Sequence, residues 1–410
     1  MPNNTWQKVR LGQIARVTSG GTPSRNIDEY WNNGEIPWIT TTAINFNTIS
    51  SGTEFITQKG LKNSSAKIFP PGTILMAMYG QGVTRGRVAI LKIEAATNQA
   101  CAAILPHKEN IETQFLFYFL SNEYEQIREM AHGGNQKNLN GELIKQIPIK
   151  LPPLPEQRKI AEILSTWDKA IDLTQHLIAA KQRRKKALMQ QLLTGRVRFP
   201  GFEGEWEETQ LRNIASNNRH SFTGGPFGSD LKSNDYTDDG VRIIQLQNIG
   251  DGEFMNSYKI YTSEEKADEL ISCNIYPGEI IISKMGDPVA RATIIPDIHK
   301  RYLMASDGIR LLVNTSKYNT KFILETINSP CFRKKALSQS TGSTRQRIGL
   351  TDLRKIQLKV PPLSEQHRIA AVLQACDEEI NLLQQKLAAL QTQKKGLMQQ
   401  LLTGKVRVEV

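Results

Sequence analysis

The sequence predicts an α+β fold with two similar domains, each followed by a long helix. Three observations predict it: the chain length, one long internal repeat, and short apolar runs broken by Gly and Pro between the repeats. At 410 residues the chain has room for two or three domains with cores of their own. Apolar residues make up 39% and charged residues 22%, which is typical of a folded globular protein.

The repeat is clearest between residues 151–198 and 360–407. Leu151-Pro-Pro-Leu-Pro-Glu-Gln recurs as Val360-Pro-Pro-Leu-Ser-Glu-Gln, displaced by 209 positions, and 27 of the 48 aligned positions are identical. The sequences that precede the two copies are also similar, though more weakly. In this alignment Arg85 and Arg291 occupy equivalent positions. The predicted layout is a first domain, a first helical segment, a second domain and a second helical segment, at residues 1–152, 153–198, 199–361 and 362–410.

Each repeat copy is predicted to form one long helix. A proline pair precedes each copy, Ser364 can cap the second, and Gly195 and Gly404 stand where a left-handed C-cap ends a helix. An apolar stripe at 3–4 spacing favours a coiled coil, and an amphipathic helix on a globular core is the alternative. The second domain lies between the helices in the chain, so paired helices would be antiparallel with a pseudo-two-fold axis. Residues near Val410 would then return to the first domain.

The domains are expected to combine short strands with one covering helix each. Alternating apolar runs bounded by Gly and Pro predict the strands. A polar loop that contains glycine ends each domain, at 133–138 and 342–347. The predicted strands are 36–39, 73–78 and 88–93, and the predicted helices are 114–129 and 321–337.

Charge and cysteine content narrow the class of protein. Lys and Arg exceed Asp and Glu by 52 − 40 = +12, which favours an anionic partner, most often nucleic acid. The four cysteines form no C-x-x-C pair and the six histidines are scattered, so no disulfide framework and no metal site are expected. The N-terminus lacks the pattern of a signal peptide, and the longest apolar run, 115–120, is too short to cross a bilayer. We expect a cytoplasmic protein with reduced cysteines and no membrane contact.

No familiar catalytic motif is present. The sequence has no Asn/Asp-Pro-Pro-aromatic loop for adenine methylation, no Gly-Lys-Ser/Thr phosphate loop, no Pro-Asp…Glu-x-Lys nuclease pattern and no Gly-x-Ser-x-Gly elbow. Gly80-Gln-Gly82-Val-Thr-Arg-Gly86 has the look of a nucleotide loop, but its strand–turn–strand context predicts a turn. The sequence therefore predicts a protein without catalytic residues and without a cofactor of its own.

Polar side chains in the glycine-rich loops suit DNA recognition. Asn and Gln can pair with adenine and Arg with guanine in the major groove, although each arginine could instead form a surface salt bridge. The run from Lys181 to Lys186 could face phosphates or a partner, or be a solvated helix face. The candidate contacts are Thr40, Thr41, Thr42, Asn45, Arg85, Arg87, Gln245, Gln247, Asn248, Arg291, Arg345 and Arg347.

The whole chain resembles a known family, the specificity subunits of type I restriction–modification systems. The resemblance rests on Ser19-Gly-Gly-Thr-Pro-Ser24, on Tyr30-Trp31-x2-Gly34-x-Ile36-Pro37-Trp38, on Gly225-Pro-Phe-Gly-Ser229 and on both helical repeats with their Leu-Met-Gln-Gln-Leu-Leu-Thr-Gly ends. It implies two target-recognition domains that each read one half of a split site in double-stranded DNA, separated by two conserved helices. It also implies assembly with two modification (methyltransferase) subunits and with restriction/translocase subunits.

The resemblance further implies that S-adenosylmethionine, ATP and Mg bind to those partner subunits, and that this chain has no catalytic residue. By the same analogy the glycine-rich loops and adjoining strands face the DNA. This adds the candidates Thr22, Ser24, Arg25, Tyr79, Gln81, Asn135, Gln136, Lys137, Asn138, Ser229, Lys232, Lys284, Ser343, Thr344 and Gln346. Two other classes stay open: a DNA-acting enzyme with an unrecognised site, and a basic coiled-coil scaffold.

Overall fold

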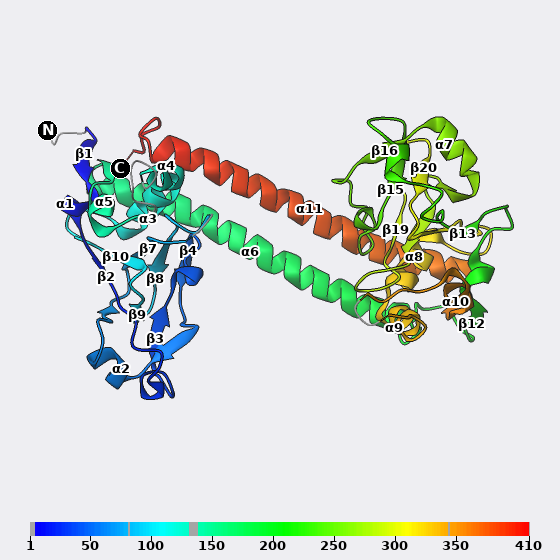
Figure 1. Cartoon of the computed structure of the whole chain (residues 1–410), viewed down its shortest axis with the longest axis horizontal. Helices are drawn as coiled ribbons and strands as arrows, with labels where there is room; N and C mark the ends of the chain where they lie inside the picture. The colour runs from blue at the N-terminus through cyan, green and yellow to red at the C-terminus, as the bar shows by residue number, and fades with distance from the viewer. Residues whose placement is uncertain (1–4, 81–82, 131–137, 343–344, 410) are drawn as a thin grey trace. The chain divides into compact units, whose positions relative to one another are not determined.

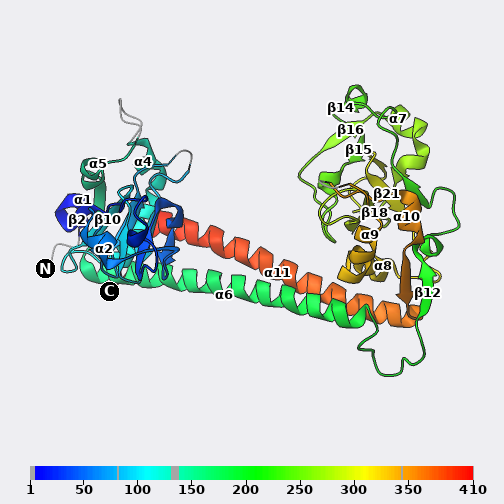
Figure 2. The same ribbon diagram turned by 60° about the horizontal axis from the view of Figure 1, so that its bottom comes forward.

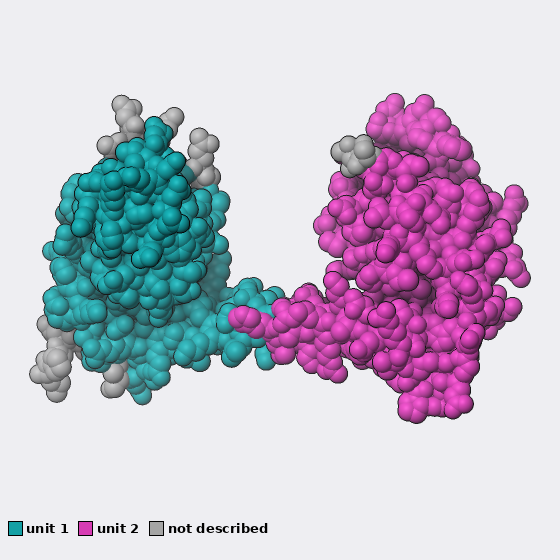
Figure 3. Space-filling view, turned by 90° about the horizontal axis from the view of Figure 1, so that it is seen from below, with its two compact units in different colours: residues 1–175, 385–410 teal, residues 176–384 magenta. Residues whose placement is uncertain are grey.

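The computed structural model describes residues 5–80, 83–130, 138–342 and 345–409. The chain divides into two compact units, coloured separately in Figure 3: unit 1 comprises residues 1–175 and 385–410, and unit 2 comprises residues 176–384. Two 39-residue helices, α6 (Leu154–Leu192) and α11 (Leu363–Leu401), are each shared between the units. The observed units therefore assign half of each helix to a domain, whereas the sequence analysis treated the helices as segments of their own.

Unit 1 contains three sheets in its described part. The first sheet pairs β1 (Gln7–Arg10) with β11 (Pro148–Leu151). The second has the strand order β2 (Ala15–Ser19), β10 (Cys101–Pro106), β7 (Ile74–Ala77), β8 (Val88–Leu91) and β4 (Asn47–Ile49). The third has the strand order β5 (Glu54–Ile56), β3 (Ile36–Ile39), β9 (Ala95–Thr97) and β6 (Ile68–Phe69). The short helices are α1 (Leu11–Ile14), α2 (Gln58–Lys62), α3 (Thr113–Asn122), α4 (Tyr124–Glu129) and α5 (Gly141–Lys145), with 3-10 turns at Asp28–Tyr30 and Thr41–Ala43.

Unit 2 repeats this plan. Its sheets are β12 (Glu207–Gln210) with β22 (Gln357–Val360); then β13 (Phe222–Gly224), β21 (Gly308–Leu311), β18 (Ile280–Ser283) and β19 (Ala292–Ile294); and β14 (Tyr236–Thr237), β16 (Ile260–Thr262), β15 (Val241–Ile244), β20 (Tyr302–Met304) and β17 (Asn274–Ile275). Its helices are α7 (Glu264–Glu269), α8 (Thr320–Asn328), α9 (Pro330–Ser338) and α10 (Leu350–Lys355). The 3-10 turns are Leu211–Ile214, Ser233–Asp235, Leu246–Asn248 and Ile271–Cys273.

Within each unit, one end of α6 pairs with the opposite end of α11 (Figures 1 and 2). In unit 1, Arg407 Nε lies 2.7 Å from Glu156 Oε1, and in unit 2, Arg198 Nη2 lies 2.7 Å from Glu365 Oε2. Glu156 and Glu365 are 209 positions apart in the sequence, and so are Arg198 and Arg407. The same contact is thus made twice with the copies exchanged, which confirms the predicted antiparallel pairing and the internal repeat.

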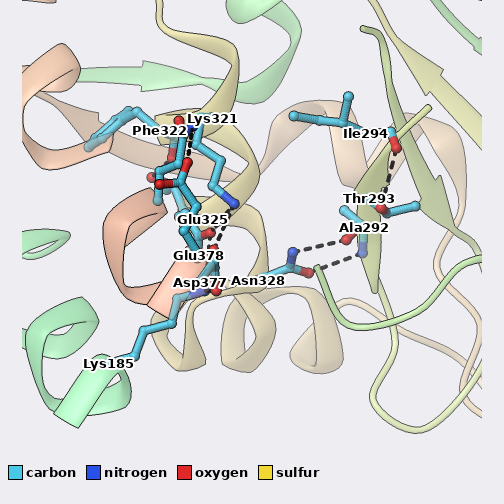
Figure 4. A network of polar contacts seen from close by, with 12 residues as sticks. Lys185, Ala292, Thr293, Ile294, Lys321, Phe322, Glu325, Asn328, Asp377 and Glu378 are labelled. Atoms are coloured by element: carbon cyan, nitrogen blue, oxygen red, sulfur yellow. Dashed lines mark hydrogen bonds and ion pairs between the residues drawn. The ribbon is translucent and has the colours of Figure 1, made fainter. Parts of the chain in front are cut away.

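A second exchanged pair joins the helices within the units, Lys394 with Asp168 in unit 1 and Lys185 with Asp377 in unit 2. In unit 2 the pair extends into a network with Lys321 and the buried Glu325 of α8 (Figure 4). Burial alone would raise the pKa of Asp377, but hydrogen bonds from Lys185 and Lys321 hold that pKa below its usual value. In the basic run 181–186, Lys185 therefore faces acidic side chains of α11 and α8 in the same unit.

Glycine ends both long helices as expected. Gly195 and Gly404 have φ of 69° and 74°, the left-handed region that only glycine adopts without strain. A tryptophan lies directly over each one, because a Cβ there would be 3.3 Å from Trp206 or 3.4 Å from Trp6. The Arg407 guanidinium lies 5.7 Å from the Trp6 ring, so the described C-terminal residues do return to the first domain.

The structure corrects three details of the predicted helices. Ser364 lies inside the first turn of α11, which begins at Leu363, so it is not the N-cap. The helix predicted at 114–129 is broken at Glu123 into α3 and α4. The helix predicted at 321–337 is broken at Ser329, because Pro330 has no N–H to continue α8, and the Ser329 hydroxyl instead caps α9 by accepting from the Phe332 N–H.

Each unit has its own core, and the helix ends belong to these cores. Leu164 of α6 is fully buried beside α3 and Leu401 in unit 1, and Leu373 of α11 is fully buried beside α8 and Leu192 in unit 2. Both alternatives for the apolar stripe thus hold in part: the helix ends pack on globular cores and on each other. Across the described ranges no helix is long and apolar enough to span a membrane.

Replacing Leu373 by Ala should lower the free energy of unfolding by about 2–5 kcal/mol, because it leaves a cavity where α11 meets the unit 2 core. Leu382→Ala is the matched control. Leu382 lies on the same helix but is 64% exposed, so its truncation should change stability by less than about 0.5 kcal/mol. Thermal and urea unfolding of the full chain measure both values, and equal effects would contradict the assignment of Leu373 to the core.

Candidate nucleic-acid interface

In unit 1, the loops with predicted contacts converge on residues 98–100, the short connection between β9 and β10. We call this connection the hub of unit 1. The Asn98 N–H donates to the carbonyl of Ile39, the residue before Thr40, at 3.0 Å. The Met78 N–H, just before Tyr79, donates to the Ala100 carbonyl at 2.9 Å. The Thr22 hydroxyl lies 2.5 Å from Gln99 Oε1. Three loops that are far apart in the sequence therefore meet at one hub.

Unit 2 builds the same hub from residues 305–307, which connect β20 to β21. The Ala305 N–H donates to the Ile244 carbonyl, just before Gln245, at 2.9 Å, and the Lys284 N–H donates to the Asp307 carbonyl at 2.7 Å. The Gly225 N–H adds a third bond, to the Gly308 carbonyl, at 2.8 Å. The loops from 225, 245 and 284 therefore meet as their counterparts do in unit 1.

Sheet topology explains why the loops converge. Strand β3 pairs in parallel with β9, and β15 pairs in parallel with β20. The carboxyl ends of each parallel pair meet at one edge, which is where α/β sheets commonly place their ligands. The chain then crosses at the hub from one sheet to the other, so the hub joins the two main sheets of its unit.

Unit 1 presents a cation stacked on aromatic rings beside its hub. The Arg25 guanidinium lies 3.7 Å from the centre of the Trp31 ring and 4.9 Å from that of Trp38, and it pairs with Glu54 at 2.6 Å. The Trp31 indole N–H donates to the Ser24 carbonyl. Stacking limits the motion of the half-exposed guanidinium, so the candidate contact Arg25 is held in a defined position.

The other unit 1 candidates differ in how available they are. The hydroxyls of Thr40 and Thr42 bond to each other at 2.7 Å at the start of the turn that also contains Thr41. Tyr79 and Asn138 are exposed at the surface, and the Asn45 N–H bonds to the Asn47 side chain. Arg87 is half-buried. Arg85, predicted as a base or phosphate contact, is buried, with only 8% of its surface exposed.

The basic side chains of unit 2 gather between its hub and the loop around residue 346. Lys284 Nζ donates to the Ser306 carbonyl at 2.7 Å, and Arg347 pairs with Asp307 at 3.0 Å. Burial, and then the nearby charge of Arg347, lower the pKa of Lys284. The Gln346 carbonyl accepts from Gly286, and Arg291 packs against that glycine, while Arg345 is exposed. These cations converge on one small surface.

The remaining unit 2 candidates include one correction. The Asn248 side chain is fully buried, its amide donating to the carbonyls of Met255 and Tyr258 and its oxygen accepting from the Gln245 N–H, so it fixes the turn and does not face a ligand. Gln245 is half-buried near the Tyr236 hydroxyl, and Gln247 is exposed. Ser229 and Lys232 are exposed on the preceding loop. The predicted contacts Gln81, Asn135, Gln136, Lys137, Ser343 and Thr344 lie outside the described residues.

Sequence reasoning missed Phe227 and Trp31 as site residues. Phe227 is 81% exposed beside the unit 2 hub, and Trp31 carries the Arg25 guanidinium. The signal was present, since a phenylalanine between Pro226 and Gly228 has little local chain to cover it. Among the residues that can be described, no group of three or more His, Cys, Asp or Glu side chains could hold a metal ion.

The hub geometry shows that the chain contains two copies of one domain plan. Comparison with known proteins identifies its family. Residues 3–181 and 205–392 both match the family described as type I restriction modification DNA specificity domain. The chain belongs to this family.

Individual relatives agree with this assignment. The chain is 25% identical to the type I restriction enzyme MjaIX specificity subunit of Methanocaldococcus jannaschii, over 98% of this chain and 94% of that one. It is 30% identical to the EcoR124I/EcoR124II specificity subunit of Escherichia coli, over 38% and 40% of the two chains. The solved S subunit from M. genitalium has the same fold, with a TM-score of 0.57 and 15% identity over 98% and 97% of the chains.

Replacing Asn248 by Ala should destabilise the chain by about 1–3 kcal/mol, because the turn would lose the hydrogen bonds that this fully buried amide makes to the carbonyls of Met255 and Tyr258 and to the Gln245 N–H. The exposed neighbour Gln247, changed to Ala, serves as the control and should leave stability within about 0.5 kcal/mol. Chemical unfolding measures both. If Asn248→Ala unfolds like the native chain, Asn248 is not the residue that fixes the turn.

Proposed function

We propose that this chain is the sequence reader of a type I restriction–modification complex, and that each of its two domains reads one half of a bipartite, asymmetric DNA site. The observation that supports the proposal best is the hub, in which two backbone bonds recur in both units while the surrounding side chains differ. Arg25 over Trp31 in unit 1 and Lys284 with Arg347 in unit 2 offer different contacts, so the two half-sites should differ.

The chain is proposed to read DNA without catalysing a reaction itself. Methyl transfer and cleavage would belong to two modification subunits and to restriction/translocase subunits, which would bind S-adenosylmethionine, ATP and Mg. The candidate contacts are amides, hydroxyls and guanidinium groups, which suit recognition. The basic balance of the chain, +12, agrees with a polyanionic ligand.

The paired helices are proposed to set the spacer between the half-sites and to offer docking surfaces to the modification subunits. Half-sites read from one face of B-DNA lie about 34 Å apart, so two readers need a spacer of defined length. A 39-residue helix extends over roughly 58 Å at ~1.5 Å per residue, which is ample for that task.

Exchanging residues 1–152 for the corresponding domain of another family member should change one half of the recognised site and leave the other half intact. Methylome sequencing of cells that carry the exchanged chain with its partner subunits reports both halves at once. The unaltered chain is the control. A change in both halves would contradict independent reading, and methylation or binding without any sequence preference would favour the basic scaffold. Methyl transfer or cleavage by the purified chain alone would favour an unrecognised enzyme.

Deleting one heptad from each helix should shorten the spacer. The deletion removes residues 174–180 and 382–388, which lie in the sequence between the exchanged Asp–Lys pairs, so both pairs can still form. Seven residues correspond to about 10 Å of helix, or about three base pairs. Methylome sequencing again gives the spacer length. An unchanged spacer would show that the helices do not measure it.

A further inference from the structure

Phe227 is held outward by a firmly anchored loop. The Gly225 backbone rests on the hub so closely that a Cβ there would lie 1.9 Å from the Ala305 carbonyl oxygen. Pro226 is buried, and the Asp230 N–H closes a turn on the Phe227 carbonyl at 2.9 Å. The ring nevertheless remains 81% exposed, more than any other large hydrophobic side chain in the described residues. The loop therefore fixes an apolar ring in water.

The surface around this ring combines apolar residues with two cations. On one side a cavity of about 220 Å³ is lined by Phe227, Tyr236 and Gln245. On the other side a cavity of about 510 Å³ is lined by Phe227, Lys284 and Arg347. The nearby carboxylates already have partners, since Asp307 pairs with Arg347 and Asp230 accepts from the Ser229 hydroxyl.

This setting favours DNA over an apolar protein surface as the occupant. Lys284 and Arg347 line the larger cavity together with Phe227, and these two cations match a polyanion better than an apolar protein surface. An exposed ring flanked by cations and an amide matches the way proteins insert an apolar wedge between base pairs and bind the adjacent phosphates.

We propose that Phe227 is a wedge that inserts between two base pairs of the half-site read by unit 2, with Lys284 and Arg347 contacting the DNA beside it. The inference rests on the proposed function, because it assumes that the unit 2 hub faces DNA. Partial unstacking is easiest at pyrimidine–purine steps, so that half-site contains such a step at the point of insertion.

Unit 1 lacks this device at its corresponding loop. There Gly20 also rests closely on Thr97, just before the hub, but the following residues present the guanidinium of Arg25 stacked on Trp31. One half-site would then be read mainly through a cation and hydrogen bonds, and the other through the deformability of its sequence as well.

The test uses the full chain assembled with its modification subunits and duplexes that carry the site found by methylome sequencing. 2-Aminopurine replaces each base of the unit 2 half-site in turn, except the methylated base, which the modification subunits would flip out regardless of Phe227, and a rise in fluorescence marks unstacking. Wild type should show a rise at one step. Phe227→Ala should abolish it and weaken target binding roughly tenfold without changing affinity for unrelated DNA. Phe227→Leu, still an apolar wedge, should keep part of the signal.

Two controls separate the wedge from its alternatives. Ile298→Ala removes another exposed apolar side chain of unit 2, 53% exposed, which precedes β20 whereas the hub follows that strand, and it should behave as wild type. A mismatch at the insertion step should strengthen wild-type binding but not that of Phe227→Ala, because the mismatch already weakens the stacking.

The outcomes are distinguishable. If the complex binds its site selectively but shows no unstacking, or if Phe227→Ala keeps the full signal, the wedge is wrong and the proposed function stands. If Phe227→Ala impairs assembly with the modification subunits and leaves the fluorescence rise unchanged, the ring contacts a protein and the wedge is again wrong. If no sequence-selective binding occurs, both proposals fail.

Discussion

The exchanged carboxylate–arginine pair is the interaction on which the rest of the structure depends. Glu156 and Glu365 are both nearly inaccessible to solvent, and a buried charge of this kind is costly unless a partner neutralises it. Each glutamate belongs to the first turns of one long helix, and each arginine follows the end of the other. The pair therefore stabilises only the antiparallel arrangement, in which the start of each long helix lies beside the end of the other long helix.

The architecture was predictable because its signals are periodic or repeated. The 209-residue displacement, the two proline pairs and the terminal glycines together indicated two long antiparallel helices, and the structure has them at 154–192 and 363–401. The strand at Ile36–Ile39 was also predicted with its observed bounds. These features depend on local patterns of hydrophobicity and on Gly or Pro, which a sequence displays directly.

The site was predictable only in part, because burial and partners depend on the tertiary fold. Asn248 and Gln247 are neighbours of similar chemistry, yet one amide is fully buried and the other is exposed. Arg85 was grouped with Arg291 from the repeat, but it is buried while Arg291 is half-buried. Phe227 has an apolar side chain, and composition alone suggests a core residue. The neighbours Pro226 and Gly228 are a weak sequence signal of exposure, and the anchored loop shows why the ring does not reach a core.

The hub bonds described above are mostly between main-chain groups: Ile39, Ile244 and Asp307 contribute carbonyls, and Asn98, Ala305 and Lys284 contribute amide hydrogens. Main-chain groups are the same for almost every amino acid. Substitutions at the loop tips can therefore accumulate without disturbing the junction that orients them. Such an arrangement lets a lineage alter what it recognises by point mutation while the junction stays constant.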